Sequence, residues 1–218
     1  MKTIGFFGDS FCGTIKNDHS VFNRYETYIE KLSKNYDAKI VNTGRGGSSV
    51  WDCILLQYQS FIKKNKLPDI CVFTWTEPSR LFHRDYRYLN HMSIENSNLK
   101  KTNTKIYNAS LNYFHHLFDL EKHNLEYTSL LYYFDKEVIS KEKNTKFIHL
   151  WCFNESVRHR WSTGVEVRPS LYPNLTRDIP SNDPAANHLG SEEKNKLVYN
   201  VIKDAIDNYE DGRLIKFL

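Results

Sequence analysis

A serine follows the first apolar segment of the chain, at a position suited to nucleophilic chemistry. The segment "TIGFF" at residues 3–7 predicts a buried strand, and Gly8, Asp9 and Ser10 follow it directly. In open α/β sheets the carboxyl ends of the strands border the crevice that binds ligands. A serine there can attack a carbonyl carbon if a neighbouring imidazole accepts its proton. The residues alone leave a second interpretation open, in which the strand simply ends in a loop.

A glycine-rich turn follows the second predicted strand, at residues 38–42. The sequence "NTGRGGSS" begins at Asn42, includes Gly47 and precedes a segment of helical period at residues 50–65. Glycine lets backbone N–H groups approach a ligand and point at it, so this turn is suited to an anion. A plain strand-to-helix turn is the alternative. A phosphate or nucleotide site has weaker support, because neither G-x-G-x-x-G nor G-x-x-x-x-G-K-[ST] occurs.

Polar residues also stand at the end of the third predicted strand and before the last predicted helix. The strand at residues 69–75 runs into "TEPSR", which begins with Thr76 and Glu77. Asp183 and His188 precede the final helix. Because the carboxyl ends of parallel strands share one edge of a sheet, we expect the serine, the glycine turn and the histidine to meet there.

The order of these motifs resembles the SGNH (GDSL) hydrolase family. The resemblance rests on Gly-Asp-Ser after strand one, on Asn42 with Gly47 after strand two, and on His188 before the last helix, so it spans the chain. It implies a three-layer α/β/α architecture with a flavodoxin-like parallel sheet. It also implies an esterase, lipase or acetyl-hydrolase type of reaction.

The resemblance further assigns a role to each matching residue. Ser10 would be the nucleophile, His188 the base and Asp183 the acid that orients the base. The N–H groups of Ser10 and Gly47 would hold the oxyanion of the tetrahedral intermediate, since such an intermediate needs fixed donors. This chemistry requires no metal and no cofactor.

The chain departs from the family pattern at the end of the third strand. The family supplies an asparagine side chain to the oxyanion hole there, and the matching segment "TWTEPSR" contains no asparagine. An ionised Glu77 would repel the oxyanion, so it either points away and pairs with Arg80 or stays protonated. Thr76 or Ser79 can donate instead. We therefore include Thr76 and Glu77 among the expected oxyanion and substrate-binding residues.

A second departure concerns the acid. The family usually places an aspartate three residues before the histidine, and that position here is Ala185. Asp183 must therefore reach His188 through a longer loop. The alternatives are Asp178 as the acid, or a serine–histidine dyad with no acid.

Short apolar runs alternate with stretches of helical period, which is typical of a βαβ protein with a parallel sheet. The predicted strands are residues 3–7, 38–42, 69–75 and 146–153. The predicted helices are residues 21–36, 50–65, 110–141, as one helix or two, and 191–209. Residues 79–107 and 154–187 are expected to be irregular insertions, and loops of this length are usually functional or mobile.

Composition narrows the classes of protein. With 218 residues, 40% hydrophobic and 14% aromatic, the chain can form one globular domain over residues 1–218. A net charge of +4 and scattered basic residues do not indicate nucleic-acid binding. The N-terminus turns polar too soon for a signal peptide, and no run of 18 apolar residues occurs, so we expect a cytoplasmic or otherwise soluble protein without a membrane segment.

The cysteines give no sign of a metal site. All four lie far apart and form no C-x-x-C pair, so buried free thiols are expected rather than disulfides or zinc ligands. They are Cys12, Cys53, Cys71 and Cys152.

These observations favour a serine hydrolase of the SGNH type that cleaves a small ester, such as an O-acetyl group on a carbohydrate. The expected partner is thus a small-molecule ester or an acetylated glycan. A catalytically silent module that binds a ligand in the same crevice, or serves a structural role, is the alternative, because the asparagine is missing and the aspartate is displaced.

Overall fold

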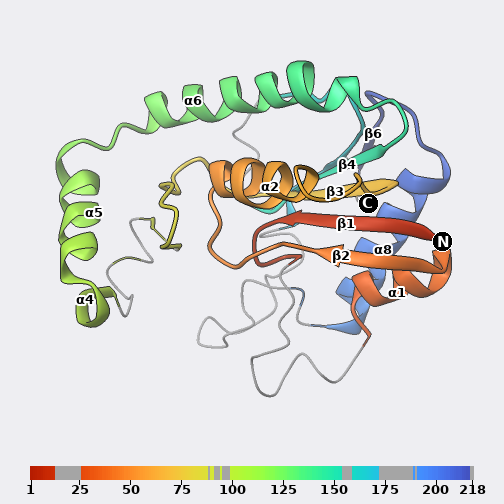
Figure 1. The fold of residues 1–218 in the computed structure, drawn as a ribbon, viewed down its shortest axis with the longest axis horizontal. Helices are drawn as coiled ribbons and strands as arrows, with labels where there is room; N and C mark the ends of the chain where they lie inside the picture. Colours follow the sequence, from red (N-terminus) through yellow and green to blue (C-terminus); the bar gives the residue numbers. More distant parts are fainter. Residues whose placement is uncertain are drawn as a thin grey trace.

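Six parallel strands form one sheet at the centre of the molecule, in the order β2-β1-β3-β4-β5-β6 (Figure 1). The computed structural model describes residues 1–12, 26–87, 89–90, 94, 99–153, 159–171, 189 and 191–216. The strands are β1 (Lys2–Gly8), β2 (Ala38–Asn42), β3 (Ile70–Trp75), β4 (Lys146–Trp151), β5 (Val165–Arg168) and β6 (Leu214–Lys216). The order 2-1-3-4-5 is that of flavodoxin-like sheets.

Helices cover both faces of this sheet, which confirms the predicted three-layer α/β/α class (Figure 1). One face carries α1 (Tyr28–Tyr36) and α8 (Glu192–Asp207). The other carries the π-helical segment η2 (Asp52–Gln59), its continuation α2 (Ser60–Ile62), and α6 (Leu120–Tyr133). Among the helices of the described residues, none combines the length and apolar character needed to cross a bilayer.

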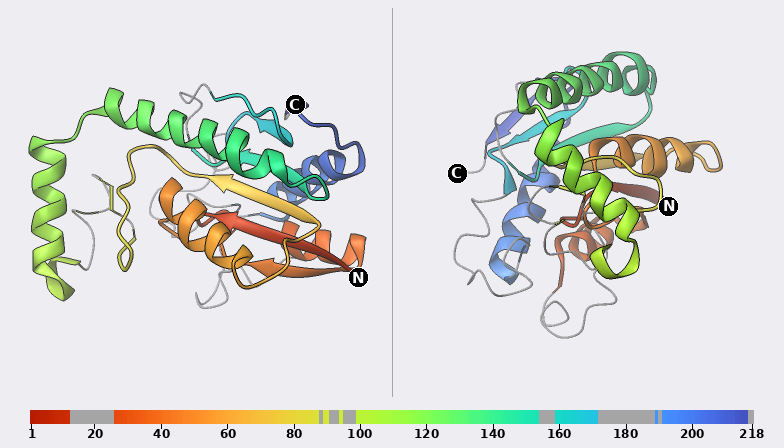
Figure 2. Two further views of the ribbon diagram at one scale, coloured as in Figure 1. Left: turned by 45° about the horizontal axis from the view of Figure 1, so that its top comes forward. Right: turned by 90° about the vertical axis from the view of Figure 1, so that its left-hand side faces the viewer.

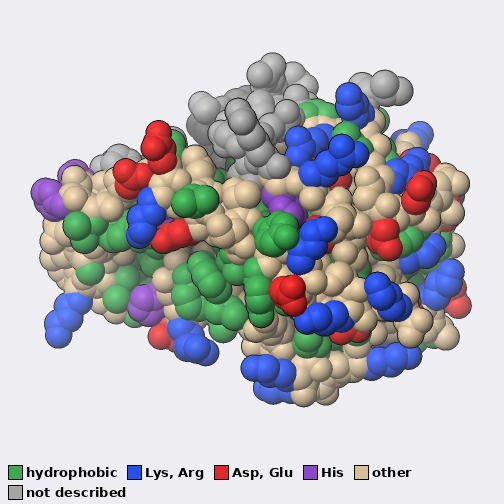
Figure 3. Space-filling view, turned by 90° about the horizontal axis from the view of Figure 1, so that it is seen from above, with side chains coloured by type: hydrophobic (Ala, Val, Ile, Leu, Met, Phe, Trp, Pro, Cys, Tyr) green, Lys and Arg blue, Asp and Glu red, His purple; other side chains and the backbone are tan. Residues whose placement is uncertain are grey.

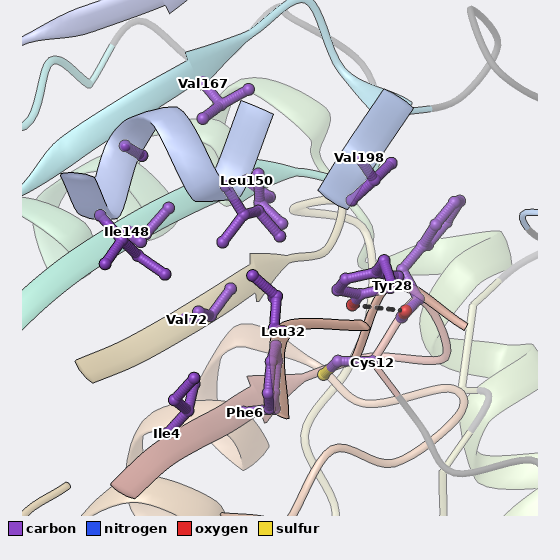
Figure 4. Packing of buried hydrophobic residues seen from close by; sticks show 14 of the residues in the cluster. Ile4, Phe6, Cys12, Tyr28, Leu32, Val72, Ile148, Leu150, Val167 and Val198 are labelled. Atoms are coloured by element: carbon purple, nitrogen blue, oxygen red, sulfur yellow. Dashed lines mark hydrogen bonds between the residues drawn. The ribbon is translucent and has the colours of Figure 1, made fainter. Parts of the chain in front are cut away.

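The alternation of side chains along each strand supplies both cores. In β1, Phe6 faces α1 and α8, where it packs with Leu32 and Val72 (Figure 4). The next residue, Phe7, faces η2 and α6 and stacks on Phe73 with ring centroids 5.3 Å apart. Successive side chains of a strand point to opposite faces, so a fully apolar run is what a strand buried on both sides requires.

The stretch predicted as helix at residues 110–141 is broken at residues 117–119. It contains the end of α5 (Thr104–His116), then α6, then the short segments η3 (Phe134–Val138) and η4 (Ile139–Lys141). Asp119 begins α6 as its N-cap, because its side chain accepts a hydrogen bond from the Lys122 backbone N–H at 2.8 Å. The sequence left open one helix or two over this stretch, and the structure shows separate helices.

The expectation of irregular structure at residues 79–107 and 154–187 is wrong in part. The first stretch contains α4 (Leu99–Thr102) and the start of α5, and the second contains β5. Asn103 separates α4 from α5 and caps α5 by accepting a hydrogen bond from the Ile106 N–H at 3.2 Å. Together α4 and α5 lie beyond one end of the sheet (Figures 1 and 2).

The junction of α5 and α6 exposes apolar side chains. Leu117, Leu120 and Leu125 are all more than half exposed. Apolar side chains are also visible between charged ones on the face that carries α6 (Figure 3). Within α5 itself, Ser110 and Phe114 are the residues that become buried.

A buried carboxylate fixes the turn that leads into β5. Asp135 is fully buried and accepts hydrogen bonds from the backbone N–H groups of Ser162 (2.9 Å) and Thr163 (3.0 Å) and from the Ser162 hydroxyl (2.9 Å). His159 Nε2 lies 3.5 Å from the same carboxylate. Burial alone would raise the pKa of Asp135, but His159, Ser162 and Thr163 outweigh it and hold the pKa below its ordinary value.

We predict that Asp135→Asn lowers the free energy of unfolding at pH 7 by about 2–3 kcal/mol, since hydrogen bonds to a charged group are replaced by a donor facing donors. The depressed pKa makes the stabilisation complete above the ordinary aspartate pKa of about 3.9 and lost as the pH falls below it. Urea unfolding of both proteins at pH 7 and pH 3 measures this. Equal losses at the two pH values would contradict the prediction.

Candidate active site

Ser10 lies on a turn directly after β1, at the carboxyl edge of the sheet. The turn is closed by a hydrogen bond from the Cys12 N–H to the Asp9 carbonyl at 3.2 Å, and Ser10 is half-buried within it. Asp9 shapes the turn, because its side chain accepts a hydrogen bond from the Phe11 N–H at 3.0 Å. The chain thus presents Ser10 where the strand-end argument predicts it.

The Asp9 side chain is buried beneath the Ser10 turn rather than exposed at its surface. It is fully buried, and its backbone N–H donates to the Thr74 hydroxyl at 3.1 Å. Burial raises the pKa of its carboxyl, and the positive charge of Arg80 offsets part of that rise. Asp9 therefore stabilises the Ser10 turn from its buried side, and Arg80 is close enough to influence the pKa of its carboxyl.

The glycine-rich turn after β2 is hydrogen-bonded to the Ser10 turn. The Arg45 N–H donates to the Gly8 carbonyl at 3.0 Å, and the Asn42 side-chain amide donates to the Cys12 carbonyl at 2.5 Å. Gly47 has a φ of +73°, in the left-handed region that favours glycine. The structure therefore brings the turn that holds Gly47 to the turn that holds Ser10.

The buried Gln57 side chain connects these two turns through hydrogen bonds. Its side-chain oxygen accepts the Gly8 N–H at 2.6 Å, while its nitrogen donates to the Gly8 carbonyl at 2.9 Å and to the Ser48 hydroxyl at 2.9 Å. Ser48 also hydrogen-bonds the buried Asp52 carboxylate. One buried amide thus contacts both the strand before Ser10 and the residue after Gly47.

The end of β3 carries the expected residues Thr76 and Glu77. Thr76 is buried, and its carbonyl accepts a hydrogen bond from the Tyr127 hydroxyl at 2.5 Å. Glu77 Oε1 accepts from Arg80 Nε and from the Asn90 side-chain amide, each at 3.1 Å. Of the two expected arrangements of Glu77, pairing with Arg80 is the one present.

The proposed base and acid cannot be placed in the same way. His188, Asp183 and the alternative acid Asp178 lie outside the described residues. Their roles stay predictions from the sequence.

Three side chains of this edge were not among the expected site residues. Gln57 falls on the apolar stripe of its helix, between Ile54 and Phe61, and a polar residue at such a position is the signal that could have revealed it. Arg80 was expected only as a partner of Glu77. Asn90 reaches Glu77 from a loop 13 residues further along the chain, and no residue spacing in the sequence predicted this particular contact.

The four cysteines are free and buried, as predicted. Burial raises the pKa of the Cys12 thiol, two residues from Ser10, and also that of Cys152. A thiol must lose its proton to act as a nucleophile, and the raised pKa values of these two disfavour that loss at neutral pH. Among the described residues, no group of three or more histidine, cysteine or acidic side chains is placed to hold a metal ion.

Comparison with known proteins gave no matching family model and no matching curated protein. Several solved structures are similar to this chain, including the following three. The acetyl xylan esterase AlAXEase has 13% identity and a TM-score of 0.35, over 99% of this chain and 77% of its own. A protein described as a GDSL-like lipase from Parabacteroides merdae has 14% identity and a TM-score of 0.41, over 94% and 95%. A carbohydrate acetylesterase family member from Sinorhizobium meliloti has 17% identity and a TM-score of 0.35, over 99% and 83%. In its strand order and in the positions of its Gly-Asp-Ser and Asn42–Gly47 motifs, the chain resembles the SGNH (GDSL) hydrolases.

Proposed function

We propose that this protein is a serine ester hydrolase of the SGNH type, with Ser10 as its nucleophile. The observation that carries the proposal is the direct hydrogen bonding of the Ser10 turn to the Gly47 turn at the carboxyl edge of the sheet. That edge is where open α/β sheets bind their ligands. Burial raises the pKa of the nearby Cys12 and Cys152 thiols, which favours a serine hydroxyl over a thiolate as the nucleophile.

In the proposed reaction the Ser10 oxygen attacks the ester carbonyl while the imidazole of His188 takes the hydroxyl proton. The N–H groups of Ser10 and Gly47 bind the oxyanion that forms. Collapse of the intermediate breaks the bond to the alcohol, which leaves with the proton from His188. Water then attacks the acyl-serine by the same steps in reverse and releases the carboxylic acid. Asp183 orients His188.

We further propose a small acyl group, such as an O-acetyl on a carbohydrate, as the substrate. The neutral Ser10 and Gly47 donors fit an ester carbonyl, and the family resemblance implies esterase or acetyl-hydrolase chemistry. A binding module that lacks catalysis is the competing function. It is favoured by two features of the sequence, the acidic Glu77 where the family has an asparagine and the absence of an aspartate three residues before His188.

A fluorophosphonate probe separates the two functions, because its phosphorus adopts the tetrahedral geometry that the site is proposed to stabilise. We predict a single label, which peptide mapping by mass spectrometry locates at Ser10. The labelling rate should fall below about pH 6.5, where an ordinary histidine becomes protonated and can no longer accept the serine proton.

Acetate release from an acetylated oligosaccharide and nitrophenol release from p-nitrophenyl acetate give the matching measure of turnover. Folded protein that stays unlabelled and hydrolyses neither ester would overturn the hydrolase and favour the binding module. Labelling at a residue other than Ser10 would overturn the assignment of the nucleophile.

A further inference from the structure

Glu77, which stands at the family's asparagine position, is a hydrogen-bond acceptor, but a strong donor, Arg80, lies beside it. The Glu77 carboxylate accepts two hydrogen bonds, one from Arg80 and one from Asn90, and these two donors fix its position. Arg80 is the cation of this pair, and its side chain is only 9% exposed. A guanidinium carries five N–H donors in a rigid plane, which is more donor capacity than an asparagine amide has.

Three contacts hold the Arg80 guanidinium in place. Its Nε donates to Glu77 at 3.1 Å, its Nη1 approaches the Ser48 carbonyl at 3.5 Å, and its central carbon lies 4.9 Å from the centre of the Phe153 ring. Stacking of this kind fixes a guanidinium while leaving its edge free to donate. Within the described part of the chain, no acceptor engages Nη2.

The same contacts locate the guanidinium beside the Ser10 turn. Ser48 directly follows Gly47, the proposed oxyanion donor. Phe153 packs edge-on against Phe11, with ring centroids 5.5 Å apart, and Phe11 directly follows Ser10. Burial raises the pKa of Asp9, which directly precedes Ser10, and the charge of Arg80 offsets part of that rise. Neighbours of both proposed oxyanion donors are therefore neighbours of Arg80.

We propose that Arg80 donates an N–H to the oxyanion, in the place that an asparagine amide takes in the family, and that Glu77 is the residue that positions it. This inference rests on the proposed hydrolase function. The pairing explains how an acidic residue stands at this position without repelling the oxyanion, because its charge is matched by the guanidinium.

The test uses p-nitrophenyl acetate, a neutral ester with no anionic group for an arginine to anchor. Arg80→Ala should lower kcat about 100-fold to 1000-fold with KM changed less than about 3-fold, because the contact forms in the transition state. Arg80→Lys keeps the charge without the planar fork and should recover only part of kcat. Guanidinium chloride at millimolar concentration should partly rescue Arg80→Ala.

The matched control is Arg213→Ala. Arg213 also pairs with a carboxylate, Asp204, at 2.7 Å, but it precedes β6 at the opposite edge of the sheet. This variant should keep the wild-type kcat and show no response to guanidinium. Two variants test the positioning role of Glu77. Glu77→Gln retains an acceptor for Arg80 and should keep most of the wild-type kcat. Glu77→Leu removes the acceptor and should lower kcat while KM stays unchanged.

Several outcomes would overturn the proposal. One is an unchanged kcat in Arg80→Ala while wild-type Ser10 still reacts with the fluorophosphonate probe, which leaves the hydrolase function intact and removes Arg80 from it. Another is a rise in KM confined to esters that carry a carboxylate, which would make Arg80 a substrate anchor. Wild-type protein that neither labels nor hydrolyses removes the function itself, and with it this role.

Discussion

Replacing Ser10 by alanine is expected to lower the rate of ester hydrolysis by at least about 10,000-fold and to abolish fluorophosphonate labelling. The reason is that the proposed acyl-enzyme cannot form without the Ser10 oxygen, and loss of a nucleophile removes the whole chemical step. Steady-state hydrolysis of p-nitrophenyl acetate and probe labelling measure the effect. The free energy of unfolding should change little, because Ser10 is half-buried and lies on a turn.

Ser140→Ala is the matched control for this experiment. It makes the same chemical change in η4, just before β4, and so at the opposite edge of the sheet, where the Ser140 hydroxyl donates to the Lys136 carbonyl. Its hydrolysis rate should equal that of the wild type. Retention of more than about a tenth of the activity in Ser10→Ala would rule out Ser10 as the nucleophile.

Gly8→Ala is expected to lower the free energy of unfolding by about 3 kcal/mol or more. Gly8 has a φ of +134°, which L side chains rarely adopt, and such strain costs about 1–3 kcal/mol. An added Cβ would also lie 2.2 Å from the Thr74 carbonyl oxygen and 2.3 Å from its hydroxyl, and overpacking adds a similar cost. Because Ser10 lies two residues after Gly8, the rate of ester hydrolysis should fall as well.

Gly212→Ala separates the two causes. Gly212 also has a positive φ, +77°, but an added Cβ there would meet no atom closer than 3.8 Å. Its cost should therefore be the conformational strain alone, about 1–2 kcal/mol. Urea unfolding of both variants measures the difference, and equal losses would show that the close contact with Thr74 is relieved at no cost.

The strands that could be predicted are those with strong apolar runs. The predicted strands at residues 3–7, 38–42, 69–75 and 146–153 match β1 to β4. For β1, β3 and β4 the reason is that a strand covered on both faces needs continuous apolar side chains, whereas β2 is a partly buried edge strand. The sequences of β5 and β6, "VEVR" and "LIK", are short and partly charged. Each is stabilised by pairing with the neighbouring strand, and a local sequence pattern carries no information about that pairing.

The candidate site shows the same limit. Ser10 and the Gly47 turn could be placed from the sequence, because each follows an apolar strand and parallel strands end at one edge. The contact of Gln57 with Gly8 spans 49 residues, and that of Asn90 with Glu77 spans 13 residues across an irregular loop. The spacing of residues in a sequence does not predict such contacts. The hydrogen bonds of Gln57 and the position of the Arg80 guanidinium beside the site were therefore found only in the structure.

The Gln57 amide also bears on the order in which this chain folds. Its bonds to Gly8 span 49 residues, and the neighbouring bond from Asp9 to Thr74 spans 65. Contacts of such long sequence separation cost loop-closure entropy and form slowly. During synthesis Ser10 emerges among the first residues, yet its turn gains these partners only after β3 has been made and docked. The proposed nucleophile is thus assembled late, so a nascent or truncated chain that ends before β3 is expected to lack the proposed esterase site.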